Sequence, residues 1–401
     1  MTGTRSQPPA LLGLVADDLT GAADSAVGFA EHGWRVDLIL RPNDPPSTST
    51  VPPTDPTPTV LAISTEARAR SDTDAARATF TAVDTLSRAG AERLYLKIDS
   101  TIRGSIPGQL AGALQAWRQA HPGATAVICP AFPAQRRTVV GGTVLVDGIP
   151  VAQTAAGTDP VTPRTVSHLA TVITGSTHGT LDQLGTQPVL VVDASTDADL
   201  DALAREASGA DPSLIMVGSG GLAAALARQW PVPANRPIGF PGAPAVAVLV
   251  AVSSLHPVAV DQVDHLRQHL GDSQLQILTS TSAANVSAAA AAAQLADQVA
   301  AELASSSYEA LVLIGGDGAA AILRRVAASH VVVDSMISVG CPSGTIVGGQ
   351  ADGLRLVTKS GGFGHRETLT AIVRGLRDPT AADTSTDPNR TAFEPTQKEA
   401  R

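Results

Sequence analysis

The chain has 401 residues, 43% of them hydrophobic and 16% charged, so it can bury a large core, and its length favours two domains. Its net charge is -9 and it has no long run of Lys or Arg, which argues against nucleic acid or an anionic membrane as the main partner. Two distant cysteines, no signal-peptide pattern and no apolar run of about 18 residues favour a reduced, cytoplasmic protein without a membrane span.

The first predicted element is a buried strand at residues 11–15, which leads into Ala-Asp-Asp-Leu-Thr-Gly-Ala at residues 16–22. Thr20 is a candidate cap for the helix that follows. Asp17 and Asp18 stand at the carboxyl end of the strand, where they suit hydroxyl recognition, proton abstraction or binding of Mg²⁺. A simpler interpretation, in which both carboxylates only complement the helix dipole, stays open.

Strands at residues 35–40 and 60–63 and a helix at residues 72–88 are predicted next, and a chemically dense stretch follows at residues 94–104. Its alternating apolar residues predict a strand. In open α/β sheets, ligands bind outside the carboxyl ends of the strands, so the polar side chains released there are candidate site residues. They are Lys97, Asp99, Ser100, Thr101 and Arg103. The alternative is an ion-paired strand end with a capping serine.

Lysine is scarce in this chain, which has only Lys97, Lys359 and Lys398. The first two stand at predicted strand ends beside Ser or Gly. A compact ammonium at such a place can approach a phosphate or a carboxylate as a point charge.

Residues 107–120 predict a helix and residues 124–129 a strand, followed by a Pro-rich turn that contains Arg136 and Arg137. The two arginines of this turn suit the binding of an anion. Alternatively, the turn is only a rigid connection that crosses the edge of the sheet. Residues 141–151 predict a β-hairpin about an Asp-Gly turn. The irregular stretch after the hairpin, which includes Asp159, is a candidate lid.

Alternating strands and helices continue to residue 229, and a proline-rich segment then predicts a boundary between domains. We therefore expect an N-terminal domain at residues 1–232, a linker at 233–244, a second domain at 245–377 and a disordered tail at 378–401. The pattern predicts an α/β fold in which each domain has a mostly parallel sheet flanked by helices, with the active site in the cleft between them.

Four turns rich in Gly and Ser occur in the second domain, at residues 253–257, 315–319, 339–346 and 358–365. Most of them directly follow predicted strands. In a parallel sheet they would gather at one edge, where their N–H groups suit a polyphosphate. None matches a Walker P-loop or a G-x-G-x-x-G fingerprint, so neither of those sites is supported.

Several of these segments together resemble the four-carbon acid sugar kinases, which act on threonate, erythronate or 3-oxo-tetronate. The matching motifs are collinear over roughly residues 10 to 375. They are Ala-Asp-Asp-Leu-Thr-Gly-Ala at 16–22, Lys-Ile-Asp-Ser-Thr-Ile-Arg-Gly at 97–104, Pro-Ala-Phe-Pro at 130–133, Gly-Gly-Asp at 315–317 and Thr-Lys-Ser-Gly-Gly-Phe-Gly at 358–364.

The resemblance implies ATP-dependent phosphorylation of the terminal hydroxyl of a four-carbon sugar acid, with Mg²⁺. It implies that the N-terminal domain holds the acid and the C-terminal domain holds the nucleotide. Carried over by position, the acceptor side comprises Asp17, Asp18, Lys97, Asp99, Ser100, Thr101 and Arg103, with Asp18 or Asp99 as the general base. The ATP side comprises Ser254, Gly315, Gly316, Asp317, Gly318, Lys359, Gly361 and Gly362. Asp317 suits Mg²⁺ or ribose.

Two positions depart from the family pattern. Gly318 stands where the family commonly has Thr, and His256 stands where it often has Ser, so nucleotide affinity can differ. Two other functions stay open, a kinase for another small sugar acid and a non-catalytic sugar-acid sensor. The sequence predicts small-molecule partners only, and it leaves the oligomeric state open, with a homodimer possible.

Overall fold

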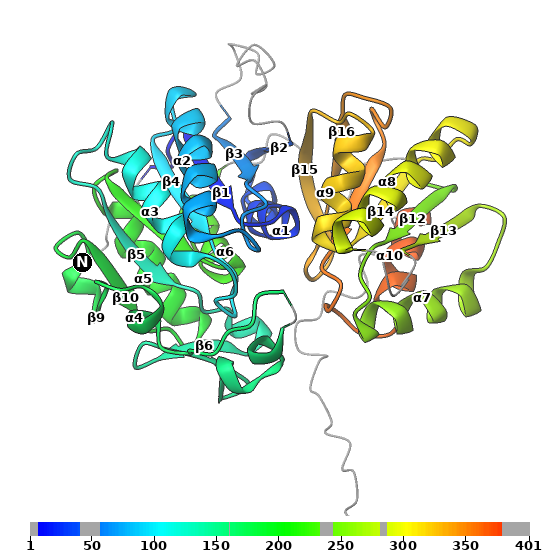
Figure 1. Ribbon diagram of the computed structural model, residues 1–401. Coiled ribbons are helices and arrows are strands. Elements are labelled where there is room, and N and C mark those ends of the chain that lie inside the picture. Colours follow the sequence, from blue (N-terminus) through cyan, green and yellow to red (C-terminus); the bar gives the residue numbers. More distant parts are fainter. Residues whose placement is uncertain (1–6, 41–56, 160, 233–243, 281–286, 379–401) are drawn as a thin grey trace, which may run out of the picture.

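The computed structural model describes residues 7–40, 57–159, 161–232, 244–280 and 287–378. The chain forms two lobes that lie side by side, an N-terminal lobe of residues 7–232 and a C-terminal lobe of residues 244–378 (Figure 1). Nearly all of the predicted linker and tail lies outside the described residues. No helix in the described ranges combines the length and apolar character needed to span a membrane.

The N-terminal lobe is built on parallel strands whose Leu, Val and Ile side chains are buried, as a sheet covered by helices requires. Its main strands are β1 (Leu11–Ala16), β2 (Arg35–Ile39), β3 (Thr59–Ser64), β4 (Arg93–Lys97), β5 (Thr125–Cys129), β9 (Thr177–Gly179), β10 (Val189–Val192) and β11 (Leu214–Gly218). Its helices are α1 (Leu19–Glu31), α2 (Asp72–Arg88), α3 (Ile106–Trp117), α4 (Leu169–Val172), α5 (Asp197–Gly209) and α6 (Gly220–Gln229). A small antiparallel sheet joins β6 (Arg137–Val140), β7 (Thr143–Val146) and β8 (Ile149–Pro150).

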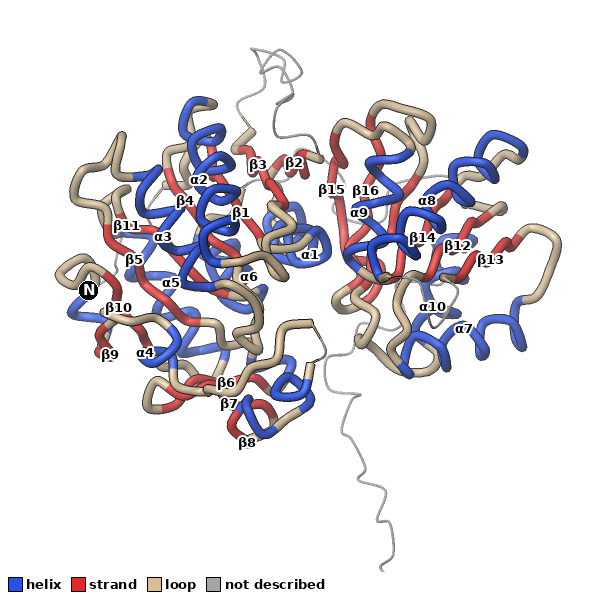
Figure 2. Tube along the Cα trace, viewed as in Figure 1, coloured by secondary structure: helices blue, strands red, loops and turns tan. Residues whose placement is uncertain are grey.

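The C-terminal lobe combines parallel and antiparallel strands. Figure 2 shows these strands in red and the helices of the lobe in blue. Its strands are β12 (Val248–Val252), β13 (Leu275–Thr279), β14 (Ala310–Ile314), β15 (His330–Ser338), β16 (Cys341–Val347) and β17 (Arg355–Lys359). Its helices are α7 (Pro257–Leu270), α8 (Ala288–Ser305), α9 (Gly316–Arg325) and α10 (Thr368–Arg377). Strands β12, β14 and β17 are parallel neighbours, so the turns that follow them lie at one edge.

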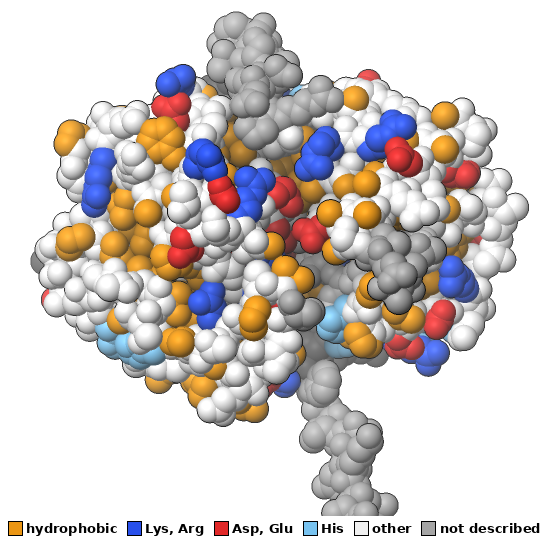
Figure 3. Space-filling model, viewed as in Figure 1, with side chains coloured by type: hydrophobic (Ala, Val, Ile, Leu, Met, Phe, Trp, Pro, Cys, Tyr) orange, Lys and Arg blue, Asp and Glu red, His pale blue; other side chains and the backbone are white. Residues whose placement is uncertain are grey.

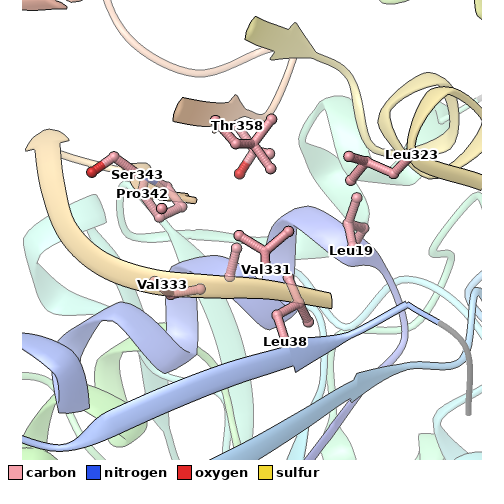
Figure 4. A pocket seen from close by; sticks show the side chains of 11 residues that line it. Leu19, Leu38, Leu323, Val331, Val333, Pro342, Ser343 and Thr358 are labelled. Atoms are coloured by element: carbon pink, nitrogen blue, oxygen red, sulfur yellow. The ribbon is translucent and has the colours of Figure 1, made fainter. Parts of the chain in front are cut away.

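The sheets of the two lobes join edge to edge, which the sequence pattern did not indicate. Strand β15 pairs antiparallel with β2 over His330–Val333, and this pairing produces one continuous 14-stranded sheet. Leu19 of α1, Leu38 of β2 and Leu323 of α9 meet beside this joint (Figure 4). The cavity that they line measures only about 10 Å³, at the lower limit for one water, so the joint is well packed.

Local predictions in the N-terminal lobe can be compared directly with the structure. The hairpin is confirmed, and its turn residues Asp147 and Gly148 have φ of 53° and 76°, as the expected turn type requires. The predicted cap of α1 is wrong. Asp18 caps the helix, because its Oδ1 accepts a hydrogen bond from Gly21 N at 3.0 Å. Thr20 instead donates to Asp18 Oδ2 at 2.7 Å.

The predicted turn at residues 339–346 is also wrong over most of its length. Residues 341–347 form strand β16, which pairs antiparallel with both β15 and β17. Pro342 is tolerated in this strand because it lies beside a register shift in β15. Only three of the four predicted turns therefore follow parallel strands at one edge.

Candidate active site

A cleft of about 530 Å³ lies between the two lobes. In the view of Figure 3, acidic and basic side chains gather where the lobes meet. The N-terminal lobe contributes most of the ionisable groups that line the cleft, namely Asp18, Asp24, Arg68, Lys97, Asp99, Arg103, Arg137 and Asp159. The C-terminal lobe contributes mainly turn residues, including His256, Lys359, Ser360, Gly362 and Phe363.

The two aspartates that follow β1 are held by Arg68, which follows β3. The Arg68 guanidinium donates to both oxygens of Asp17, at 2.9 and 2.8 Å, and to Asp18 Oδ1 at 2.8 Å. Asp17 is wholly buried and does not line the cleft, and its burial raises its pKa against the attraction of Arg68. Burial acts in the same direction on Asp18, but Arg68 and Lys97 outweigh it and lower the pKa of that carboxyl. Arg68 thus anchors the end of β1.

Asp99, just beyond β4, forms a second network with Arg103. Arg103 Nε and Nη2 donate to the two Asp99 oxygens at 3.0 Å each, and Thr101 adds a backbone and a hydroxyl donor. Burial would raise the pKa of Asp99, but Arg68 and Arg103 hold it well below its usual value. Arg103 Nη1 also bonds Asp159 at 3.0 Å, so the predicted lid segment touches the site.

Lys97 ends β4 and is only 5% exposed. Among the residues that the structure describes, its ammonium forms no hydrogen bond or ion pair, although it attracts the Asp18 and Asp24 carboxylates. A buried cation whose donors are unused is available to an anionic ligand. Beside it, Arg137 donates to Ser100 Oγ at 2.7 Å, so Ser100 is positioned by the arginine turn.

The three turns after β12, β14 and β17 meet on the C-terminal side. Gly315 has φ of 103°, and a β-carbon there would overlap Ser253 Oγ and lie 3.2 Å from Ser254 N. A β-carbon at Gly361 would overlap Ser254 Oγ. Gly316 begins α9, and a β-carbon on it would lie 3.3 Å from Asp18 Oδ2, so this turn reaches the N-terminal lobe.

Lys359 supports the last of these turns from within. It is fully buried, and its ammonium donates to the carbonyl oxygens of Ser360 and Phe363 at 2.8 and 2.7 Å. Burial lowers its pKa to about 8. Lys359 therefore shapes the glycine turn, and it is among the residues that line the cleft.

The two positions that depart from the family pattern have clear local surroundings. A β-carbon at Gly318 would overlap the side chain of Ser253, so Ser253 occupies the space that a larger residue would need. His256 caps α7 by accepting from Val258 N through Nδ1 at 3.2 Å, and it faces Gly362 in the cleft.

The structure brings most of the predicted acceptor residues into one cleft. Asp18, Lys97, Asp99, Ser100, Thr101 and Arg103 line it, as do Lys359 and Gly362. Six other predicted residues do not line it but form or adjoin the glycine turns, namely Ser254, Gly315, Gly316, Asp317, Gly318 and Gly361.

Sequence reasoning missed Arg68 and Asp24 as candidates. The available signal for Arg68 was its place just after a predicted strand, at the same edge as Asp17. No three His, Cys, Asp or Glu side chains within the described residues are grouped to hold a metal ion.

Comparisons with known proteins identify the relatives of this chain. The family model for a sugar-binding N-terminal domain matches residues 12–226, and that for a nucleotide-binding C-terminal domain matches residues 249–369. A D-threonate kinase from Bordetella bronchiseptica is 35% identical, over 92% of this chain and 98% of the relative. A D-erythronate kinase from Heliobacterium modesticaldum is 27% identical, over 90% of this chain and 95% of the relative.

A solved structure from Bordetella bronchiseptica, described as a domain-swapped dimer with bound citrate, is 34% identical with a TM-score of 0.50. The match covers 92% of this chain and 98% of that one. Together, the two matched family models, the near-complete coverage and the identity to the D-threonate kinase show that this chain belongs to the four-carbon acid sugar kinase family.

Proposed function

We propose that this protein is an ATP-dependent kinase that phosphorylates the terminal (4-) hydroxyl of a four-carbon sugar acid. The observation that carries this proposal is the contact between two unlike surfaces across the cleft. Gly316, at the start of α9, faces Asp18 and Thr20 of the N-terminal lobe. Phosphoryl transfer depends mostly on positioning and charge neutralisation, and both surfaces provide for this.

The acceptor side is proposed to hold the sugar acid by charge and hydroxyl contacts. Arg103 suits the carboxylate of the acid through the N–H groups that remain beyond those bonded to Asp99 and Asp159, since a guanidinium has five donors. Ser100 and Thr101 offer hydroxyls to the sugar oxygens. Lys97 is proposed to meet either the carboxylate or the transferring phosphoryl group. Asp17, Asp18 and Asp99 keep this surface in place through Arg68 and Arg103.

The nucleotide side fits a triphosphate for two reasons that the chain itself provides. Gly315 caps α9 without a side-chain hydrogen bond, so the first N–H groups of the helix have no side-chain acceptor and suit phosphate oxygens. Gly361 and Gly362 add no side chain at the centre of the facing turn. When bound, ATP supplies the phosphoryl group and its accompanying Mg²⁺ neutralises charge, for which Asp317 is the proposed protein carboxylate.

A coupled ADP-release assay across D- and L-threonate, D- and L-erythronate and the 3-oxo acids tests this function. We expect acid-dependent ADP release, with D-threonate as the first candidate because of the 35% identity to a D-threonate kinase. NMR of the product should place the phosphate on the terminal oxygen. Turnover of a different small acid would favour the alternative kinase. Tight acid binding without ADP release would favour the sensor.

We also propose a division into an acid-binding domain at residues 1–232 and a nucleotide-binding domain at 245–377, a cytoplasmic location and a homodimer. The dimer is proposed because the related Bordetella structure is described as a domain-swapped dimer. Light scattering during size-exclusion chromatography measures the oligomeric state directly.

A further inference from the structure

Asp24, the aspartate within helix α1, faces the same cleft as Asp18. It is half-buried on α1 and lines the cleft with Lys97. A β-carbon at Gly220 would lie 2.8 Å from Asp24 Oδ2, so the carboxylate lies against the first turn of α6. Its position is thus set by two packed helices.

Asp24 differs from Asp18 in its hydrogen bonding. Asp18 Oδ1 accepts from Arg68 and from Gly21 N, and its Oδ2 accepts from Thr20. Both of its oxygens are therefore occupied by donors. The carboxylate of Asp24 has no hydrogen-bond or ion-pair partner in the part of the chain that the structure describes, so its lone pairs are free.

Asp99 is even less available than Asp18. Its two oxygens accept several hydrogen bonds from Arg103 and Thr101, and two guanidinium groups stabilise its charge. A carboxylate stabilised in this way is a weak proton acceptor. Each oxygen of the two bases expected from the sequence thus already accepts at least one hydrogen bond, whereas the Asp24 carboxylate accepts none among the described residues.

The charged surroundings of Asp24 include both lobes. Burial raises its pKa, Lys97 of β4 and Arg137 of β6 act against this rise, and Asp18 adds to it. Across the cleft, burial raises the pKa of the Cys341 thiol of β16 to about 12, with Lys359 acting to lower it and Asp24 to raise it. Asp24 lines the cleft together with Lys359 and Gly362 of the C-terminal lobe, where the nucleotide is proposed to bind.

We propose, building on the kinase function proposed above, that Asp24 is the general base of the reaction. Its carboxylate takes the proton of the acceptor's terminal hydroxyl while that oxygen bonds to the γ-phosphorus. The bond between the γ-phosphorus and the bridging oxygen breaks, and its electron pair leaves with ADP. The Lys97 ammonium lies 2.8 Å from the position of a β-carbon on Gly21, which is one turn before Asp24 on α1. Lys97 is therefore placed to neutralise the charge that develops on the transferring phosphoryl group.

The test compares Asp24→Asn and Asp24→Glu with wild type in the ADP-release assay, together with calorimetric binding of the sugar acid and of ATP. A positioned base contributes about 10²–10⁴-fold, so kcat of Asp24→Asn should fall at least about 100-fold, with both dissociation constants within about 3-fold of wild type. The fall of kcat at acidic pH should disappear in Asp24→Asn. Asp24→Glu should recover part of the activity.

Two controls separate catalysis from folding. Ser25→Ala changes the neighbouring buried residue, whose hydroxyl has no partner among the described residues, and kcat should stay within about 2-fold. Asp24→Asn removes a carboxylate whose ionisation burial disfavours, so its melting temperature at pH 8 should equal or exceed that of wild type.

The possible outcomes are distinct. If wild type turns over and Asp24→Asn keeps kcat within about 3-fold, the inference is wrong and the kinase function stands. A loss confined to acid binding makes Asp24 a binding residue and likewise overturns the inference. If wild type releases no ADP with any acid, the proposed function is wrong, and so is the assignment of Asp24 as the general base.

Discussion

The two walls of the cleft present opposite chemistry on similar strand-to-turn connections. On the N-terminal wall, the side chains of Arg68, Lys97 and Arg103 supply charge, and carboxylates hold the two arginines in place. On the C-terminal wall, glycines leave the backbone open, and the one lysine is bound to backbone carbonyls. The difference teaches that one wall offers charged side chains held by ion pairs and the other offers backbone N–H groups where no side chain fits, which under the proposed function suit the acid and the triphosphate respectively.

Removing the guanidinium of Arg68 tests whether the charge network stabilises the N-terminal wall. Arg68→Met leaves the wholly buried Asp17 without its bidentate partner, so unfolding in urea should require about 3 kcal/mol less free energy than in wild type. Arg88→Met, which breaks an exposed pair with Asp84, should cost less than about 0.5 kcal/mol. Equal losses in the two variants would show that the charge network is not what stabilises this wall.

On the C-terminal wall, the equivalent change is a single methyl group. Gly361→Ala places a β-carbon on Ser254 Oγ, so we expect ATP to bind at least about 10-fold more weakly in calorimetry, while acid binding stays unchanged. Adding Ser254→Gly relieves the overlap and should recover part of the affinity. Gly123→Ala, where a β-carbon meets open space, is the control. Unchanged ATP affinity in Gly361→Ala would argue against the glycine cradle.

A smaller effect, on stability as a function of pH, is expected at Glu66, which lies near carboxylates of both walls. Burial raises the pKa of Glu66 to about 7, with the hydrogen bond from Ser64 opposing this rise and the carboxylates of Asp18 and Asp317 adding to it. A raised folded pKa means that ionised Glu66 costs stability, so this cost grows from about pH 4.5 to 7 and is then constant.

Glu66→Gln removes the ionisation of this residue. Its melting temperature should exceed that of wild type by on the order of 2 °C at pH 8, with the difference vanishing near pH 4.5. Glu206→Gln, at an exposed position on α5, controls for the change of net charge. A Glu66→Gln gain that does not depend on pH would refute the electrostatic explanation.

The smallest effect is expected at His256, which caps α7 from the nucleotide side. Serine also caps helices well, so His256→Ser should change the free energy of unfolding by less than about 0.5 kcal/mol. Because His256 only faces Gly362 at the edge of the cleft, ATP affinity should change less than about 3-fold. A larger loss of ATP affinity would show that the His256 imidazole contacts the nucleotide, in addition to the backbone groups of the C-terminal wall.

Particular segments show how far the sequence could predict this protein. The helix predicted at residues 72–88 is α2 at the same residues, because Ser71 caps it and its apolar residues recur on one face. The stretch at residues 341–347 was misjudged, since its Gly, Ser and Pro are typical of a turn and only pairing with β15 and β17 makes it a strand. Arg68 was missed because its two aspartate partners are far away in sequence.

The α/β class, the places of most strands along the chain and the motifs that carry the family resemblance depend on local patterns of apolar, polar and glycine residues, and the sequence alone determined them. Only the tertiary structure decided which carboxylates have donors, because Asp18, Asp24 and Asp99 look alike in sequence and differ in their neighbours. It also decided that β15 joins β2, since an edge pairing between distant strands leaves no periodic signal. The physical reason is that hydrogen bonds and charges act over a few ångströms of space, whatever the separation along the chain.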